Sequence, residues 1–155
     1  MRFQHGAAPN ENYTEGVTDV PVIVNYRDAV ANESNKSWTV PDGEMWKLNF
    51  AQINLSTSAT VGNRQIEVHI IDADGNIVIG LTAGAVQAAN TTRTYSYIQG
   101  IFRETAFIDN EIQCPLAVDA YIPAGYSIRF YDNKAISAES DDMTVSFQVK
   151  RFKGC

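Results

Sequence analysis

The side chains best suited to chemistry are few in this chain and lie far apart. Its 155 residues include two histidines, His5 and His69, and two cysteines, Cys114 and Cys155. Neither histidine has a second histidine or a cysteine at metal-ligand spacing, and no base lies beside Cys114 to favour a thiolate. We predict no catalytic residue, no metal and no cofactor. We expect His69 to face solvent from a strand and the cysteines to be free thiols, with a disulfide between them as the alternative.

Two acidic segments are the remaining candidates for binding a cation. Asp72-Ala73-Asp74-Gly75-Asn76 begins like a calcium loop. An EF-hand needs Gly at position six and Glu at position twelve, where this chain has Ile77 and Ala83, so we predict a hairpin turn instead. The segment from Asp132 to Asp142 has carboxylates at both ends. A solvated acidic loop is the simpler interpretation, and cation binding stays open.

Aromatic side chains form a third candidate, a platform for sugar rings. Alternation along a strand places Trp46 with Leu48 and Phe50, a pattern typical of core packing. Tyr95 and Tyr97 share one face, which could be exposed. We favour core or interface packing and keep a carbohydrate platform as the alternative. The aromatic residues considered are Trp38, Trp46, Tyr95, Tyr97, Tyr121, Tyr126 and Tyr131.

Composition excludes several classes of function. The net charge of −6 and the pI of about 4.8 leave no basic surface for non-specific nucleic-acid binding. No run of 18 apolar residues is present, so no membrane span is expected. Residues 1–10 lack the apolar segment of a signal peptide, so we expect synthesis in a cytosol. No phosphate-binding loop, G-x-S-x-G elbow or H-E-x-x-H motif occurs.

The elements that must position these residues are strands. The chain holds 14 Ile, 13 Val and 11 Thr against 4 Leu. Branching at Cβ restricts side chains in helices and suits a pleated surface. Short alternating segments are separated by turn residues along the whole chain. We therefore predict an all-β protein, an antiparallel β-sandwich of jelly-roll type with about eight strands.

Two details indicate two packed sheets. In the long strand expected from Met45 to Thr57, the apolar positions change parity, which predicts a β-bulge near Ala51-Gln52 and suggests a strand shared between sheets. The segment Val40-Pro41-Asp42-Gly43-Glu44-Met45-Trp46-Lys47-Leu48 is echoed by Ile122-Pro123-Ala124-Gly125-Tyr126-Ser127-Ile128-Arg129-Phe130. Each predicts a turn that leads into a strand, as two Greek keys folded together would require.

Further elements follow from the same alternation. The run from Met143 to Val149 is the clearest half-buried strand. Pro21 restricts the segment Val20-Pro21-Val22-Ile23-Val24 to a strand start or a sheet edge. Other expectations are a polar loop at Asn32 to Ser37, a loop from Leu81 to Thr92, a β-rich stretch from Tyr95 to Phe107 interrupted at Gly100, and a strand pair formed by Ala117 to Tyr121 with Tyr126 to Tyr131.

The domain organisation is simple. Residues 1–20 have few apolar positions, so we predict an extended or flexible N-terminal arm. We predict that residues 21–155 form a single β-sandwich domain with a short basic C-terminal tail. Two interpretations of residues 1–20 remain: a flexible terminus, or an arm that becomes ordered against another subunit. If the arm and the tail bind a partner, the residues expected to do so are Phe3, Tyr13, Lys150, Arg151 and Lys153.

Several segments resemble small β-sandwich virion proteins of tailed bacteriophages, most of all head decoration or cement proteins. They are Trp38-x-Val40-Pro41-x-Gly43-x-x-Trp46, Val61-Gly62-Asn63-Arg64, the segment from Ile122 to Asp132, and Asp141-Asp142-Met143-Thr144-Val145. The resemblance spans about residues 38–150 and carries no catalytic residue. It implies a structural protein that sits on the capsid shell as an oligomer and contacts neighbours through terminal arms.

The hypotheses differ in class. The first is a non-enzymatic capsid decoration protein located in the virion. Its expected partners are the major capsid protein or other virion subunits and copies of itself, with a trimer favoured, and neither nucleic acid nor membrane. The second is a phage tail or fibre component, or a carbohydrate-binding module, that recognises a receptor. The third and least favoured is a jelly-roll hydrolase with convergent carboxylates.

Overall fold

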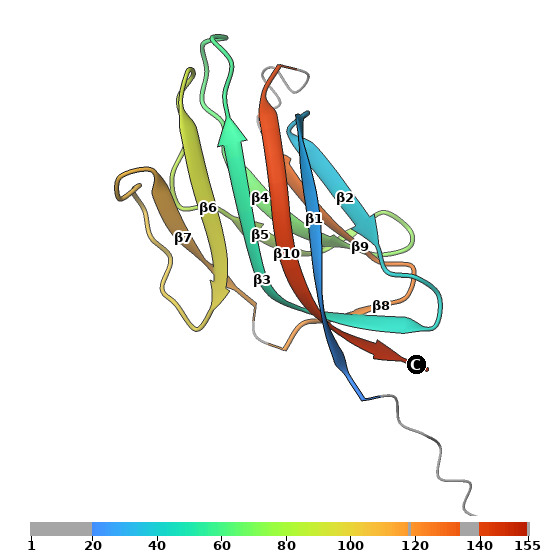
Figure 1. The fold of residues 1–155 in the computed structure, drawn as a ribbon. Helices are drawn as coiled ribbons and strands as arrows, with labels where there is room; N and C mark the ends of the chain where they lie inside the picture. Colours follow the sequence, from blue (N-terminus) through green and yellow to red (C-terminus); the bar gives the residue numbers. More distant parts are fainter. Residues whose placement is uncertain (1–19, 118, 134–139, 155) are drawn as a thin grey trace, which may run out of the picture.

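A computed structural model describes residues 20–117, 119–133 and 140–154. The described chain forms ten strands in two packed sheets, and no helix is present among these residues (Figure 1). The strands are β1 Val22–Asn32, β2 Asn35–Thr39, β3 Glu44–Ser56, β4 Ile66–Ile71, β5 Ile77–Thr82, β6 Thr92–Gln99, β7 Glu111–Leu116, β8 Tyr121–Pro123, β9 Ser127–Asp132 and β10 Asp142–Lys153.

The order of the strands is that of a jelly roll. Sheet A has the order β1-β10-β3-β6-β7, with β8 paired to the first part of β3, and sheet B has the order β2-β9-β4-β5. Consecutive strands cross repeatedly from one sheet to the other, as two Greek keys require. The predicted fold class is confirmed. The described chain has ten strands where about eight were expected, and β7 lies parallel to β6.

The core fills the space between the sheets. In β10, Met143, Val145, Phe147 and Val149 are at most 2% exposed and point inward, which confirms the clearest of the predicted strands. Rings from both sheets meet there. The edge of Trp38 packs on Phe147 with ring centroids 4.8 Å apart. Such edge-to-face contacts stabilise a core beyond the area that they bury.

The predicted bulge in β3 exists, but at a different residue. Leu48 and Phe50 lie opposite consecutive residues of β10, so Asn49 is the extra residue, two positions before the predicted Ala51-Gln52. The bulge returns the later apolar residues to the same core face. The strand therefore stays within sheet A and is not shared between sheets. Phe50, expected in the core, is half-buried and lines a hollow on the outer face.

The two echoed turns lie side by side. Gly43 and Gly125 have φ of +73° and +81°, values that favour glycine. The Val40 N–H donates to the Tyr126 carbonyl at 2.8 Å, and the Gly125 N–H donates to the Val40 carbonyl at 3.0 Å. Each turn then leads into a different sheet, the first into β3 and the second into β9. The echo in the sequence therefore corresponds to two equivalent corners of the sandwich.

Three expected elements are corrected. Most of the loop predicted at Asn32 to Ser37 belongs to strands, because β2 begins at Asn35 and buries Lys36. The segments 117–121 and 126–131 do not pair, since β8 joins β3 and β9 joins β2 and β4. The β-rich stretch ends at Gln99, and the next strand is β7, which contains Pro115 and was not predicted. Proline is tolerated there because β7 lies at a sheet edge.

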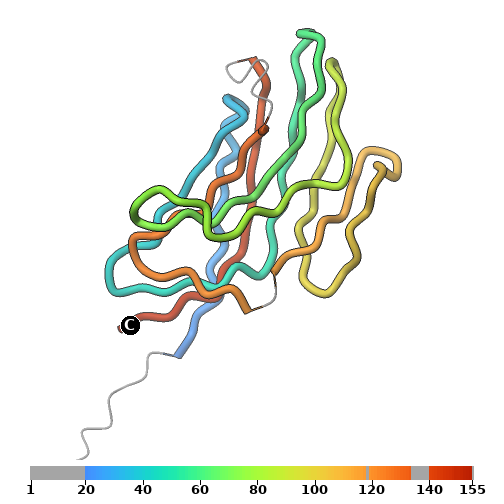
Figure 2. Tube along the Cα trace, turned by 180° about the vertical axis from the view of Figure 1, so that it is seen from behind, coloured from blue at the N-terminus to red at the C-terminus, as the bar shows by residue number. Residues whose placement is uncertain are grey.

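The last strand is longer than predicted. β10 runs to Lys153, so Lys150, Arg151 and Lys153, expected in a tail, are strand residues. Their partners in β3 are Lys47, Trp46 and Glu44 in that order. Seen from behind, the start of β1 and the end of β10 lie at the same end of the sandwich (Figure 2).

Candidate interaction surfaces

The residues considered first for chemistry are buried and inert. Cys114 is a fully buried free thiol whose pKa is raised by burial, so it lacks the thiolate character of a nucleophile. Cys155, and with it the proposed disulfide, lies outside the described residues. The prediction that His69 faces solvent is wrong. Its side chain is on the outer face of sheet B but is only 5% exposed, because neighbouring side chains cover it.

Around His69 the outer face of sheet B forms one hydrogen-bonded cluster. Glu67 accepts from His69 Nε2 at 2.8 Å, Asn133 Nδ2 at 2.8 Å, the Tyr131 hydroxyl at 2.9 Å and the Thr82 hydroxyl at 3.1 Å. Burial acts to raise the pKa of Glu67, but these hydrogen bonds outweigh it and lower the pKa. Both carboxylate oxygens are therefore occupied by donors of the protein itself, and the cluster stabilises the sheet.

A second polar cluster is completely enclosed. Arg64 and Asp141 are both 0% exposed and form a bidentate pair, with Nε–Oδ2 at 2.8 Å and Nη2–Oδ1 at 3.1 Å. Arg64 Nη1 also donates to the carbonyls of Thr60 and Gly62, and the Ser58 N–H donates to Asp141. Burial acts to raise the pKa of Asp141, and the hydrogen bonds from Arg64 and Ser58 lower it overall. The pair closes this end of the sandwich.

Two described carboxylates of the acidic segment considered for a cation are used internally, whereas Asp142 is exposed. Asp132 Oδ1 accepts from the Gln65 N–H at 2.9 Å, and Asp141 is paired with Arg64. Residues 134–139 lie outside the described part of the chain. Within the described ranges, no group of three or more His, Cys, Asp or Glu side chains could hold a metal ion. The segment Asp72 to Asn76 is the predicted hairpin turn, with Gly75 at φ +89°.

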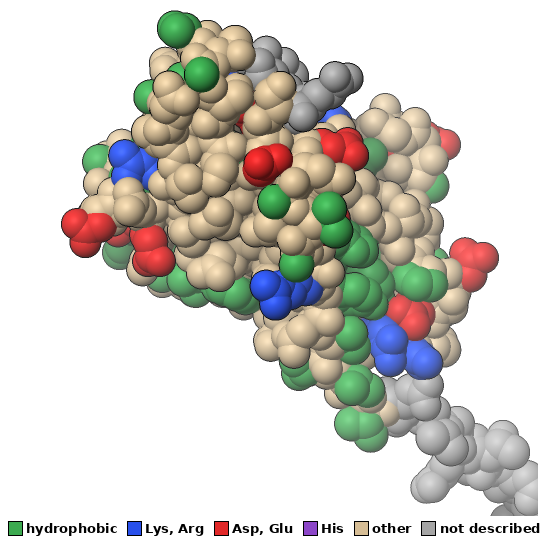
Figure 3. Space-filling model, turned by 45° about the horizontal axis from the view of Figure 1, so that its top comes forward, with side chains coloured by type: hydrophobic (Ala, Val, Ile, Leu, Met, Phe, Trp, Pro, Cys, Tyr) green, Lys and Arg blue, Asp and Glu red, His purple; other side chains and the backbone are tan. Residues whose placement is uncertain are grey.

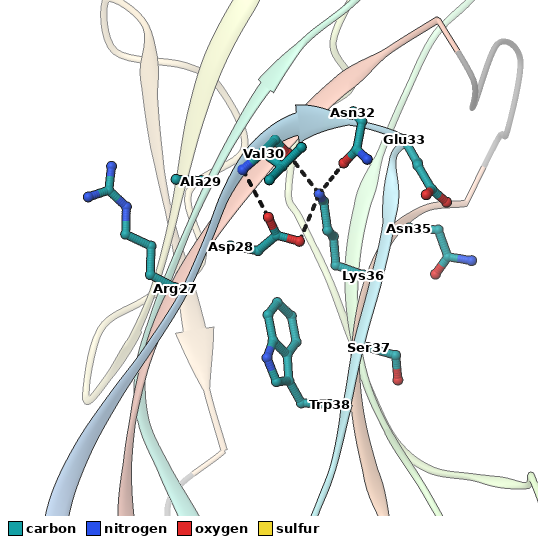
Figure 4. Close-up of a pocket in the computed structure, with 10 residues that line it drawn as sticks. All are labelled: Arg27, Asp28, Ala29, Val30, Asn32, Glu33, Asn35, Lys36, Ser37 and Trp38. Carbon is teal, nitrogen blue, oxygen red and sulfur yellow. Dashed lines mark hydrogen bonds and ion pairs between the residues drawn. The ribbon is translucent and has the colours of Figure 1, made fainter.

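A polar pocket of about 510 Å³ lies between the edges of the two sheets (Figure 4). Its buried charge is Lys36 of β2, whose Nζ donates to Asp28 Oδ2 at 3.0 Å, the Val30 carbonyl at 2.9 Å and Asn32 Oδ1 at 2.6 Å. All three N–H groups of the ammonium are thus used within the protein. Lys36 joins β1 to β2 and is not free to bind a ligand.

The outer face of sheet A differs from these clusters because it is open and its central rows are uncharged. Charged side chains lie at its margins, namely Arg27 of β1, Glu111 of β7 and Asp142 of β10. Alternation places uncharged polar side chains of β10, β3 and β6 outward in rows. One row sets Thr144 beside Asn54 and Thr94, and the next sets Ser146 beside Gln52 and Ser96. We call this surface the neutral face. Its members in β3, β6 and β10 are Phe50, Gln52, Asn54, Ser56, Thr92, Thr94, Ser96, Ile98, Thr144, Ser146 and Gln148.

Few hydrogen bonds join the side chains of the neutral face, although Gln148 accepts from Asn49 at 3.5 Å and donates to Asn25 at 3.0 Å. Asn54 donates to Thr94 at 3.2 Å, and the hydroxyls of Ser56 and Thr92 are 2.8 Å apart. Amide and hydroxyl groups have more donors and acceptors than these pairs use, so capacity remains for a partner. The surface seen in Figure 3 is mostly uncharged, with isolated acidic and basic side chains. Depletion of charge is the compositional mark of the centre of a protein interface.

At the base of sheet A lies a second open surface, the basic–aromatic patch, made of Lys47, Tyr121, Lys150 and Phe152. The Tyr121 and Phe152 rings are 5.8 Å apart, Lys150 Nζ lies 5.5 Å from the Phe152 ring centre, and Lys47 Nζ lies 5.8 Å from that of Tyr121. Lys47 is also paired with Asp119. Tyr121 is 50% exposed. In Figure 3, hydrophobic and basic side chains gather at this end, beside the start of the described chain.

The predicted partner-binding residues are brought together only in part. Lys150 is at the centre of the patch. Arg151 points to the other side of β10, where Nη1 lies 3.8 Å from Glu44 Oε1, and Lys153 shares that side. Phe3 and Tyr13 lie outside the described residues.

The aromatic platform considered from the sequence is not assembled. Trp46, Tyr95 and Tyr97 are at most 2% exposed, and only Tyr121 contributes a half-exposed ring to the patch. The sequence analysis missed the neutral face. The signal was present, since Thr144, Ser146 and Gln148 alternate with apolar residues, but which strands lie beside β10 could not be known.

Comparisons with known proteins add little beyond the fold. No family model matches the chain, and no curated protein matches it. One solved structure with some likeness is a chain in a structure of infectious bursal disease virus Gx strain, with 14% sequence identity and a TM-score of 0.41. The likeness covers 99% of this chain and 37% of that chain, so this chain spans about a third of its length. No helix among the described residues is long and apolar enough to cross a membrane.

Proposed function

We propose that this protein is a non-enzymatic structural subunit of a virus particle, specifically a bacteriophage capsid decoration protein that binds the head surface. The observation that carries the proposal is the neutral face. It is formed by long strands of a rigid sandwich, and its side chains offer hydrogen bonds without charges to desolvate. A protein that works by fitting against a shell of other subunits needs such a surface.

Two further observations support a structural role over an enzymatic one. Glu67, Asp141 and Lys36, half-buried or buried charged groups of the described chain, are each paired by donors or acceptors of the fold. The free thiol of Cys114 is enclosed in the core. A hydrolase needs carboxylates that converge on an open cleft. A hollow of about 420 Å³ beside β7 is lined by Glu104, Asp109 and Glu111, but Glu104 Oε2 there accepts the Gln113 N–H at 2.6 Å.

The test has two steps. Mass spectrometry of purified particles should detect the protein as a virion component. Binding of the full chain to particles that lack it, measured by co-sedimentation, should then be lost in Gln52→Arg, because an unpaired charge at the centre of an interface costs several kcal/mol to desolvate. Ser37→Arg is the matched control, since Ser37 is equally exposed on the outer face of sheet B. Equal binding by the two variants would refute the neutral face as the contact.

One observation favours a second candidate, recognition of a receptor glycan by a tail or fibre component. Tyr121 and Phe152 expose rings beside the uncharged amides and hydroxyls of the neutral face, and sugars are bound by stacking and by such groups. A glycan array separates the candidates. Binding to glycans that is lost in Tyr121→Ala, without binding to heads, would support the second candidate and overturn the first.

A further inference from the structure

The free edge of sheet A is divided into two halves. In the later half of β1, the Val30 N–H donates to Asp28 Oδ1 at 2.9 Å and the Val30 carbonyl accepts from Lys36 Nζ at 2.9 Å. The register also shifts between Asp28 and Asn32. A buried lysine and a bulge are devices that stop a sheet edge from pairing with another chain. The later half of β1 is therefore blocked.

The first half of β1, from Val22 to Arg27, has none of these devices among the described residues. Its register with β10 is regular, and Val22 and Ile23 are each 51% exposed. In an antiparallel edge strand, every second residue points its N–H and C=O away from the sheet. This half therefore presents a row of backbone groups that another strand can pair with.

The other edges of the sandwich are covered or short. At β7, Gln113 and Glu104 exchange two hydrogen bonds, with the Gln113 N–H 2.6 Å from Glu104 Oε2 and the Glu104 N–H 3.2 Å from the Gln113 carbonyl. β5 carries a register shift, and its Leu81 carbonyl accepts from the Tyr97 hydroxyl. β2 has only five residues. The unprotected edge of the described chain is the first half of β1.

The chain that precedes this edge has the charge and the length to pair with it. Residues 11–19 carry Glu11, Glu15 and Asp19 and no Lys or Arg, a net charge of −3. The basic–aromatic patch adjoins the edge, because Ile23 pairs with Lys150, which in turn pairs with Lys47. Extended, the 19 residues before Val20 reach roughly 60 Å, against about 20 Å for the six residues of the edge.

We propose that residues 11–19 of one copy add as a strand to the Val22 to Arg27 edge of a neighbouring copy, with their acidic side chains on the basic–aromatic patch. Pairing with its own edge is disfavoured. Pro21 keeps the preceding residue extended, and Val17-Thr18-Asp19-Val20 lacks the Asn-Gly or Asp-Gly pair that a tight turn favours. Such head-to-tail exchange forms a ring where the rotation between copies closes, and an open filament where it does not. It concerns contact between copies and does not depend on binding to a capsid.

The test uses two full-length variants with opposite charge changes. In Lys47→Glu/Lys150→Glu, both the segment and the patch are acidic. In Glu11→Lys/Glu15→Lys, both are basic. Each variant alone should associate at least tenfold more weakly than the unmodified protein in sedimentation velocity, since like charges then face each other. Mixed in equal amounts, the two should recover association, because each segment then meets a patch of opposite charge.

A control and a second measurement complete the test. Asp74→Lys changes an exposed charge in the β4–β5 turn and should leave association unchanged. Hydrogen exchange of those amides between Val22 and Arg27 that point away from β10 should be slow in the oligomer and fast in either charge variant. The proposal is overturned if the unmodified protein is a monomer at 100 μM (roughly a hundredfold above a micromolar Kd), if mixing restores nothing, or if the edge is protected in a monomer. Loss of capsid binding with association intact would refute only the proposed function.

Discussion

The enclosed cluster around Arg64 and the neutral face of sheet A are both polar, yet they have opposite roles. Arg64 and Asp141 are fully buried, and their hydrogen bonds are all made within the fold. The side chains of the neutral face make few hydrogen bonds with one another, and most stay at least partly open to solvent. The Glu67 cluster on sheet B lies between these extremes. Polar groups in this protein thus either hold the sandwich together or remain available to a partner, depending on how far they are enclosed.

The largest expected effect comes from breaking the enclosed pair. Arg64→Met leaves the Asp141 carboxylate buried without its partner and should lower the free energy of unfolding by about 3–5 kcal/mol. Urea denaturation followed by the fluorescence of the buried Trp46 measures it. The double variant Arg64→Met/Asp141→Leu should recover much of the loss, because no unpaired charge remains. If the double variant is as unstable as Arg64→Met alone, the pair stabilises the fold through the packing of its side chains and not through its charges.

A smaller loss of unfolding free energy is expected from changing the Glu67 cluster on sheet B. Glu67→Gln keeps the shape of the side chain but removes the charge that four donors share. Hydrogen bonds to charged groups contribute about 1.5–3 kcal/mol each, against about 0.5–1.5 kcal/mol for neutral ones. We expect a loss of about 1–2 kcal/mol in the same assay. Thr82→Val, which removes a single donor to Glu67, is the milder control and should cost less.

The stability that the Glu67 and Asp141 clusters contribute should depend on pH. The pKa values of Glu67 and Asp141 are both lowered in the folded protein, by hydrogen bonds that outweigh the effect of burial. Their contribution to stability is therefore complete above the unfolded pKa values of about 4 and is lost as pH falls through the lower folded values. Unfolding free energies measured from pH 7 to pH 2 should decline below about pH 4. The decline should be shallower in Glu67→Gln; an identical slope would contradict this account.

The smallest effect on stability is expected on the neutral face. Ser146→Ala and Gln52→Ala remove side chains that the fold does not enclose, so each should change the unfolding free energy by less than about 0.5 kcal/mol. Differential scanning calorimetry should show nearly unchanged melting temperatures. A loss above about 1 kcal/mol would mean that the neutral face stabilises the sandwich and would remove its contrast with the Arg64 cluster.

Much of the fold could be predicted from residue types. The β-branched composition indicates strands, the alternation from Met143 to Val149 indicates one buried face, and the two echoed turns indicate equivalent corners. The elements that failed were those where a local rule was overridden. Pro115 is tolerated because β7 is an edge strand, and the polar sequence around Lys36 forms a strand because Asp28 and Asn32 satisfy the buried ammonium. Both reasons depend on neighbours distant in the sequence.

By itself, the sequence determined the sandwich class, the positions of most strands and turns, and the scarcity of groups suited to catalysis. Only the tertiary structure decided which polar residues became structural and which stayed open. His69 and Ser146 each follow the alternation of a strand onto an outer face, but His69 is covered by its neighbours and Ser146 is not. The periodicity of a strand specifies which face a residue takes. Its burial and hydrogen-bond partners depend on which strands lie beside it, and in a jelly roll these come from far along the chain.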